Sequence, residues 1–124
     1  MDTNKSVIVI GLVPELVDFT PFPGVTAEKV RAGISAEVAK LVTLGYAAES
    51  IFVDFGETAE AVLAGILAER SFACVCIGAG VRTAPPHFLL FERLINLVHV
   101  KAPQAKICFN TSPTDTADAV QRWI

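Results

Sequence analysis

Short apolar runs alternate with segments of helical periodicity along this chain, and this alternation limits the fold more than any other feature. The apolar runs are nearly uninterrupted, which is typical of strands buried on both faces of a sheet. Strands separated by helices pair in parallel, because a parallel connection needs a crossover segment. We predict strands at residues 7–12, 51–54, 72–77 and 106–109.

Helical periodicity accompanies each predicted strand, over residues 26–44, 58–70, 88–100 and 112 to about 123. Thr26 is a favourable N-cap for the first helix, and Gly45 is expected to end it. The fourth has the clearest start, with Ser112 as N-cap, Pro113 at the first helical position and Asp115 at the third. In the second helix we expect four residues to face the core: Val62, Leu63, Ile66 and Leu67.

The 124 residues contain no repeat, linker or low-complexity segment, so we expect a single α/β domain over residues 1–124. Right-handed crossovers give a doubly wound βαβαβαβα arrangement of three layers, most simply with four or so parallel strands in the order 2-1-3-4. In outline this architecture resembles a flavodoxin-like or Rossmann-like core, and the resemblance is one of architecture alone. The resemblance implies a ligand crevice at the carboxyl ends of the strands, between the loops after the first and third.

Composition excludes several classes of protein. With 52% hydrophobic and 19% charged residues and a mean hydropathy of +0.53, the chain is too apolar to be disordered. The net charge of −3 argues against a general nucleic-acid binder, which needs clustered Lys and Arg. The apolar run at residues 6–10 is too short for a membrane span or a signal-peptide core, so we expect a cytoplasmic protein without membrane contact.

A glycine-rich turn follows the third strand and is the main candidate for ligand binding. It runs from Gly78 through Gly80 and Arg82 to Thr83, ahead of prolines that are expected to open a helix. Glycines let backbone N–H groups approach a bound group, the arginine offers a planar set of donors, and a helix N-terminus favours negative charge. The turn therefore predicts binding of a phosphate, sulfate or carboxylate group. The alternative is a turn without a ligand, in which Arg82 pairs with a surface acid.

Other polar residues are expected at the same edge of the sheet. Asn110 and Thr111 precede the last helix and are predicted to add hydrogen bonds to the ligand. Asp54 ends the second strand, where dinucleotide-binding folds place the acid that binds a ribose hydroxyl, although capping of the following turn explains it equally well. His87 is a candidate proton donor or acceptor, with a structural histidine as the alternative.

The loop after the first strand differs from a phosphate-binding loop. Residues 11–15 lack the glycine fingerprint of dinucleotide-binding proteins, so we expect no nicotinamide or flavin cofactor. Residues 13–25 include three prolines together with Phe19 and Phe22. This composition predicts a lid or wall of the crevice, or else a packed surface loop.

The sequence contains three cysteines, Cys74, Cys76 and Cys108, all within predicted strands. Their spacing fits neither a zinc site nor a disulfide framework, so we expect buried, reduced thiols. Cys76 lies closest to a strand end and is the one cysteine that we consider as a nucleophile. No metal-ligand spacing involves either histidine, and no triad of serine, histidine and acid is evident.

The third predicted helix carries apolar residues on its polar face. Its polar stripe consists of Glu92, Arg93, Asn96 and His99. Leu89 and Val100 fall within this stripe and would be exposed in a monomer, so we predict a homodimer through this helix. Ordinary scatter of exposed apolar residues is the alternative.

These features favour a small cytoplasmic protein that binds an anionic ligand, nucleotide-like ones included, with or without converting it. A second hypothesis is a non-catalytic interaction module that oligomerises through its apolar helices. A hydrolase or isomerase that uses His87, with Cys76 or Asp54, is the third. The sequence does not decide whether the protein is an enzyme.

Overall fold

The computed structural model describes residues 5–55 and 57–124, and the strands within them form one parallel sheet. These strands are β1 (Ser6–Leu12), β2 (Ala47–Val53), β3 (Cys74–Ile77) and β4 (Lys106–Phe109). Their order across the sheet is β2-β1-β3-β4, and each neighbouring pair is parallel. The predicted α/β class, strand order and three-layer outline are confirmed.

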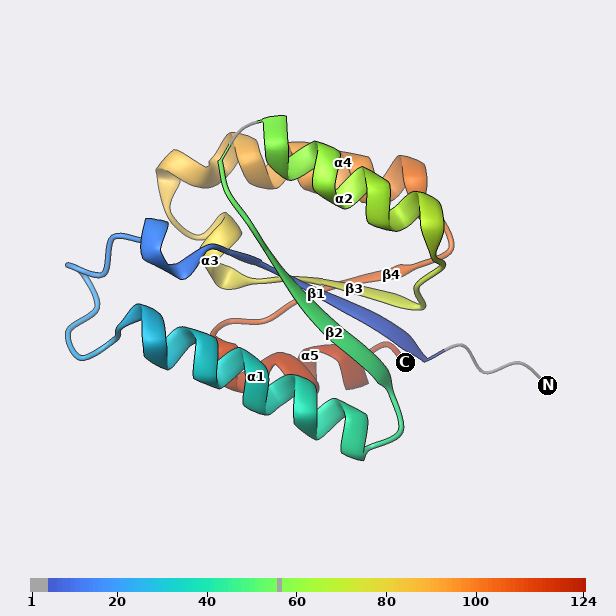
Figure 1. Ribbon diagram of the computed structural model, residues 1–124, viewed down its shortest axis with the longest axis horizontal. Helices are drawn as coiled ribbons and strands as arrows, with labels where there is room; N and C mark the ends of the chain where they lie inside the picture. Colours follow the sequence, from blue (N-terminus) through green and yellow to red (C-terminus); the bar gives the residue numbers. More distant parts are fainter. Residues whose placement is uncertain (1–4, 56) are drawn as a thin grey trace.

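Helices cover both faces of this sheet. α1 (Ala27–Thr43) and α5 (Thr116–Gln121) lie on one face, and α2 (Glu57–Glu69) and α4 (Phe88–Lys101) lie side by side on the other (Figure 1). The single turn α3 (Ala79–Arg82) lies beyond the carboxyl end of β3. Short 3-10 helices occur at η1 (Pro14–Leu16), η2 (Pro85–His87) and η3 (Pro113–Asp115). Within the described residues, no helix has both the length and the apolar character needed to cross a membrane.

The core lies on both sides of the sheet, because side chains alternate between its faces along each strand. On β1, Ile8 belongs to the cluster under α2 and α4, whereas Val9 belongs to the cluster under α1 and α5. Cys74, Cys76 and Cys108 are all buried in the second cluster as free thiols, without a disulfide bond among them. Cys74 and Cys76, two residues apart on β3, therefore face the same side of the sheet.

Helix ends that were predicted from local capping residues are confirmed. Thr26 Oγ1 accepts a hydrogen bond from the Lys29 backbone N–H at 3.2 Å, and Gly45 follows the helix with a φ of +99°. Ser112 and Asp115 form the expected capping box. The helix that it starts is shorter than predicted, since it opens as the 3-10 turn η3 and α5 ends at Gln121.

The predicted starts of two strands are wrong, and so is the predicted burial of one residue of α2. β2 begins at Ala47 rather than at residue 51, because an edge strand can form without a continuous apolar run. β3 begins at Cys74 rather than at residue 72. Val62 is 43% exposed, since α2 packs on one face of the sheet and turns this residue outward. The buried residues of α2 are Ala59, Leu63 and Leu67, and Ile66 is partly buried.

Candidate functional site

The carboxyl ends of the strands lie at one edge of the molecule, as a parallel sheet requires. The segments that continue from them are residues 13–26, 54–55, 78–87 and 110–115. These segments gather at the left of Figure 1, with α3 among them. The residues predicted to bind a ligand lie in the last three segments, as do Asp54 and His87, so the fold brings them to one edge, whereas Cys76 lies within β3.

Gly78 is required by the close packing of the turn on β1. Its N–H donates to the Ile10 carbonyl oxygen at 2.8 Å, and a Cβ at Gly78 would lie only 3.0 Å from that oxygen. A Cβ at Gly80 would be in ordinary contact with its nearest neighbour, at 3.8 Å. Among the described glycines only Gly24 and Gly45 have a positive φ, so this turn lacks the alternating right- and left-handed backbone of an anion-binding nest.

Asn110 links the turn after β3 to the start of α5. Its Oδ1 accepts a hydrogen bond from the Ala79 N–H at 2.8 Å, and its Nδ2 donates to Thr116 Oγ1 at 2.9 Å. Thr116 Oγ1 in turn donates to the Pro113 carbonyl oxygen at 2.8 Å. Asn110 is 1% exposed. Both polar groups of this amide are therefore engaged within the protein, and the amide occupies the first N–H of α3.

Thr111 and Thr83 are also engaged in local hydrogen bonds. Thr111 donates to the Asp115 carboxylate through its backbone N–H at 2.9 Å and its Oγ1 at 2.5 Å. The Ser112 N–H donates to the same carboxylate at 3.2 Å. Burial acts to raise the pKa of Asp115, but these hydrogen bonds outweigh it and lower the pKa below its usual 3.8. Thr83 Oγ1 donates back to the Ala79 carbonyl oxygen at 2.8 Å.

Arg82 has a different environment from the arginines that form ion pairs. Its Cζ lies 5.3 Å from the ring centroid of Phe109, at the end of β4. Its Nε is buried and has no hydrogen-bond partner among the described residues. Arg31, Arg70 and Arg93 each form an ion pair with a glutamate, but none is found for Arg82 in the described part of the chain. The alternative expected from the sequence, a surface ion pair, is therefore not observed for this residue.

Asp54 and His87 lie elsewhere along the same edge. Asp54 directly follows β2, and its Oδ1 is buried without a partner among residues 5–55 and 57–124. His87 is 7% exposed, and its Nδ1 lies 2.8 Å from the Gly80 carbonyl oxygen. A carbonyl oxygen can only accept, so Nδ1 carries a proton and Nε2 is the acceptor of the neutral ring. Over the same residues, no ion pair joins Asp54 to His87 or to Arg82.

Two aromatic residues contribute to this edge without being indicated by the sequence patterns. The Phe55 ring centroid lies 4.9 Å from that of His87, at an interplanar angle of 51°. Phe109 lies under Arg82 and also makes an edge contact with Phe91 of α4, at 5.8 Å between centroids. Side chains alternate along a strand, so Phe109 faces α2 and α4 because its neighbour Cys108 faces α1 and α5. The Phe55 contact joins segments distant in sequence, and no local pattern indicates it.

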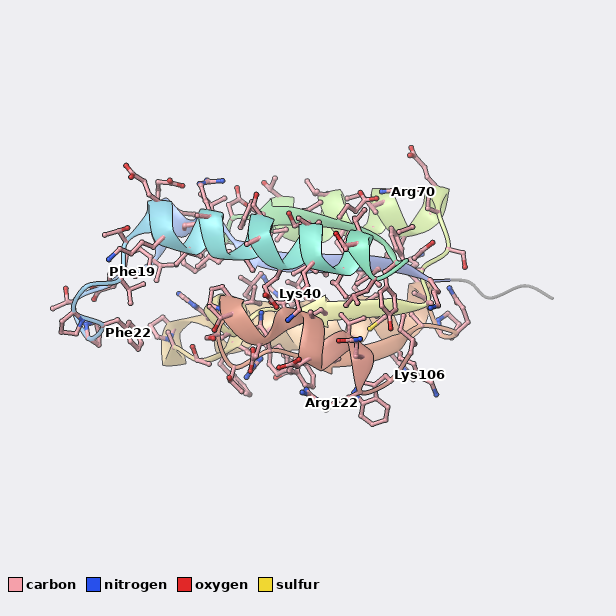
Figure 2. The ribbon with its side chains drawn as sticks, turned by 90° about the horizontal axis from the view of Figure 1, so that it is seen from below. Phe19, Phe22, Lys40, Arg70, Lys106 and Arg122 are labelled. Carbon is pink, nitrogen blue, oxygen red and sulfur yellow. The ribbon has the colours of Figure 1, made fainter. Side chains whose placement is uncertain are left out.

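The loop after β1 projects past the amino end of α1, and Phe19 and Phe22 lie on its projecting part (Figure 2). Phe22 is 53% exposed and therefore does not serve as core. At the base of the loop, Arg31 of α1 binds the Glu15 carboxylate at 2.6 Å. The loop lies at the same end of the molecule as the turn after β3 (Figure 1).

Two hollows in the described surface lie away from this edge. One has a volume of about 270 Å³, lies at the amino ends of the strands and includes Glu49 and Arg70 in its lining. These two residues already bind each other, with Arg70 Nη2 donating to Glu49 Oε1 at 2.6 Å. The other hollow, of about 380 Å³, lies between α2 and α4 and includes Arg93 and Val100 in its lining.

Cys76, the candidate nucleophile, is completely buried. Its contact with the Cys108 thiol and its burial raise its pKa far above that of a free thiol. Contact with the Cys74 thiol raises the pKa of Cys108 to about 12, and the two sulfur atoms lie 3.5 Å apart. A thiolate at Cys76 is therefore strongly disfavoured. In the described residues, no cluster of His, Cys, Asp and Glu is suited to hold a metal ion.

No model of a known protein family matches the chain, and no curated protein matches it. We therefore infer function from the geometry of the site.

Proposed function

We propose that this protein binds a small anionic ligand at the carboxyl edge of its sheet, with Arg82 as the principal contact. One observation carries the proposal: the Arg82 guanidinium rests on Phe109 with a buried Nε and has no acceptor among the described residues. A buried polar group without a partner costs about 1–3 kcal/mol, and more when it is charged. An anion that supplies the acceptor relieves this cost, so binding is favoured.

The guanidinium geometry narrows the class of ligand. Its planar donors match the paired oxygens of a phosphate or carboxylate, and hydrogen bonds between charged groups are stronger than those between neutral ones. The Phe109 ring restricts the orientation of the side chain, so less conformational entropy is lost on binding. We therefore expect a phosphate ester or a carboxylate at this position.

Asp54 supports an elongated ligand. Its buried Oδ1 also has no hydrogen-bond donor among the described residues, and it would accept a hydrogen bond from a hydroxyl group. Asp54 follows β2, whereas Arg82 lies over β4, and these strands form opposite edges of the sheet. Three strand spacings separate them, or about 14 Å. A carboxylate repels an anion, so the two residues would contact different parts of one ligand of nucleotide size.

The proposal does not include a chemical reaction. Cys76 is buried and its pKa is raised, so it is poorly suited to act as a nucleophile. His87 is expected to contribute the Nε2 acceptor to the same edge, because its Nδ1 is held by Gly80. Binding without conversion is the simplest function that these residues support.

Thermal unfolding in the presence of phosphate, sulfate, citrate and nucleoside phosphates tests this proposal. At about 100 times its Kd, a ligand that binds only the folded state stabilises it by about 2.7 kcal/mol, which raises Tm by several degrees. We expect such a rise for wild type with at least one phosphate-bearing ligand. Arg82→Ala should abolish the rise and Arg82→Lys should reduce it, because lysine keeps the charge but loses the planar donors.

Matched variants separate this site from general charge effects. Arg31→Ala removes the same charge from an arginine already bound to Glu15, and it should retain the wild-type response. Asp54→Asn should reduce the response to nucleoside phosphates but not to inorganic phosphate. The proposal is wrong if no anionic ligand raises Tm, or if Arg82→Ala responds as wild type does.

A further inference from the structure

The outward face of α2 and α4 carries apolar side chains that nothing in the single chain covers within the described residues. Val62 of α2 is 43% exposed, and Leu89 and Val100 of α4 are 54% and 68% exposed. The hollow between the two helices opens on this face. On α2, Gly65 is also exposed, so a second helix could approach its backbone closely.

The exposed residues of α4 between Leu89 and Val100 are arranged almost symmetrically about Asn96. Successive residues of a helix turn by about 100°, so Leu89, Arg93 and Val100 lie on one side of the line through Asn96. This is the side toward α2, because Arg93 Nε lies 3.6 Å from Glu60 Oε1. By the same rotation, Glu92 and His99 lie on the side away from α2. In the described part of the chain neither of them forms an ion pair.

This arrangement is complementary to itself when a second α4 packs in the opposite direction. A two-fold axis at Asn96 then places Glu92 beside the partner's His99, where the imidazole N–H can donate to the carboxylate. The same axis places Leu89 beside the partner's Val100. Each contact occurs twice, so Glu92 is paired with His99, and Leu89 and Val100 are covered. Antiparallel packing also aligns the two helix dipoles favourably.

We propose that the outward face of α2 and α4 binds a second copy of this chain, with the two α4 helices antiparallel and centred on Asn96. This surface is separate from the carboxyl edge that contains Arg82. The proposal therefore holds or fails independently of ligand binding.

Sedimentation velocity between about 1 and 100 µM, a range that covers typical dimer affinities, tests the association. We expect wild type to sediment as a dimer at the upper end of this range. Val100→Glu places a carboxylate in the apolar contact and should raise the dimer dissociation constant by at least about tenfold. Val42→Glu makes the same change on α1, at a valine that is 54% exposed, and should leave the constant unchanged.

The helix orientation is tested by disulfide crosslinking with copper phenanthroline, which oxidises two thiols to a disulfide. Asn96→Cys should crosslink because residue 96 meets its own copy at the axis. Glu92→Cys should not, since the two copies of residue 92 lie about 12 Å apart along antiparallel helices. Ala39→Cys on α1 is the negative control. The native cysteines are buried and should not contribute.

Several results would overturn the proposal. They are a monomeric wild type at 100 µM, an equal effect of the two glutamate substitutions, and failure of Asn96→Cys to crosslink. Efficient crosslinking of Glu92→Cys would show parallel packing and would refute the proposed geometry. A reversal of charge gives a further check, because Glu92→Lys should weaken the dimer and the added change His99→Glu should restore it.

Discussion

Asn110, Thr111 and Arg82 lie at the same edge of the sheet, but their hydrogen bonds give them different roles. Both polar groups of the Asn110 amide form hydrogen bonds, to Ala79 and Thr116, and Thr111 binds Asp115. Side chains with satisfied hydrogen bonds hold the edge together and have little to offer a ligand. Arg82 Nε lacks such a partner among the described residues, which makes it the centre of the proposed site.

The surroundings of each cysteine also determine how its thiol is expected to react. Cys74, Cys76 and Cys108 are at most 1% exposed, and the pKa values of Cys76 and Cys108 are raised. The thiolate is the reactive form, so we expect all three to resist a thiol reagent at neutral pH in the native protein and to react in denaturant. Counting modified thiols with a chromogenic disulfide reagent measures this. Rapid labelling of native Cys76 would contradict the structure and restore the nucleophile hypothesis.

Among the elements, α5 depends most directly on a short sequence signal. Asp115 accepts hydrogen bonds from Thr111 and Ser112 at the start of this helix. Asp115→Asn should lower the free energy of unfolding at pH 7 by about 1 kcal/mol, the usual contribution of such a cap. Asp118→Asn is a matched control, because Asp118 is an exposed acid in the first turn of the same helix.

The Asp115 contribution should also depend on pH. Hydrogen bonds lower its pKa below 3.8 in the folded state, so its stabilising effect is complete well above pH 4. The effect is lost as pH falls through the folded pKa, because the carboxyl must then be protonated in both states. In urea unfolding, the difference in stability between wild type and Asp115→Asn should therefore narrow as the pH falls from 7 to 3. A constant difference over this range would contradict the assigned role.

At the scale of the whole molecule, the two faces of the sheet are expected to unfold together. Leu63 of α2 and Leu41 of α1 are both completely buried, in clusters on opposite faces of the sheet. Leu63→Ala and Leu41→Ala should each lower the free energy of unfolding by about 2–5 kcal/mol, the usual range for this change. Because β1 contributes side chains to both clusters, each variant should retain a single transition.

Denaturant unfolding followed by far-ultraviolet circular dichroism and by Trp123 fluorescence tests this expectation. The two signals should give the same midpoint in wild type and in both variants. A biphasic curve for one variant, or separate midpoints for the two signals, would mean that the two layers unfold independently.

The chain sequence alone determined the α/β class, the parallel sheet, the strand order and the caps at Thr26 and Ser112. These features depend on periodicity and on hydrogen bonds between residues a few positions apart, so a short stretch of sequence contains the whole interaction. The sequence also placed Arg82, Asp54 and Asn110 at one edge, because parallel strands end together. It could not tell which of these side chains already had partners.

Tertiary structure decided that remaining question. Asn110 engages Ala79, Arg82 lies on Phe109, and Phe55 packs on His87. Packing also decided the exposure of Val62, because α2 turns only one face toward the sheet and Val62 lies outside that face. Each of these contacts joins different elements, and its geometry depends on how helices and strands pack rather than on neighbours in sequence. A residue type shows which bonds a side chain can form, but only its packed surroundings decide which of them are made.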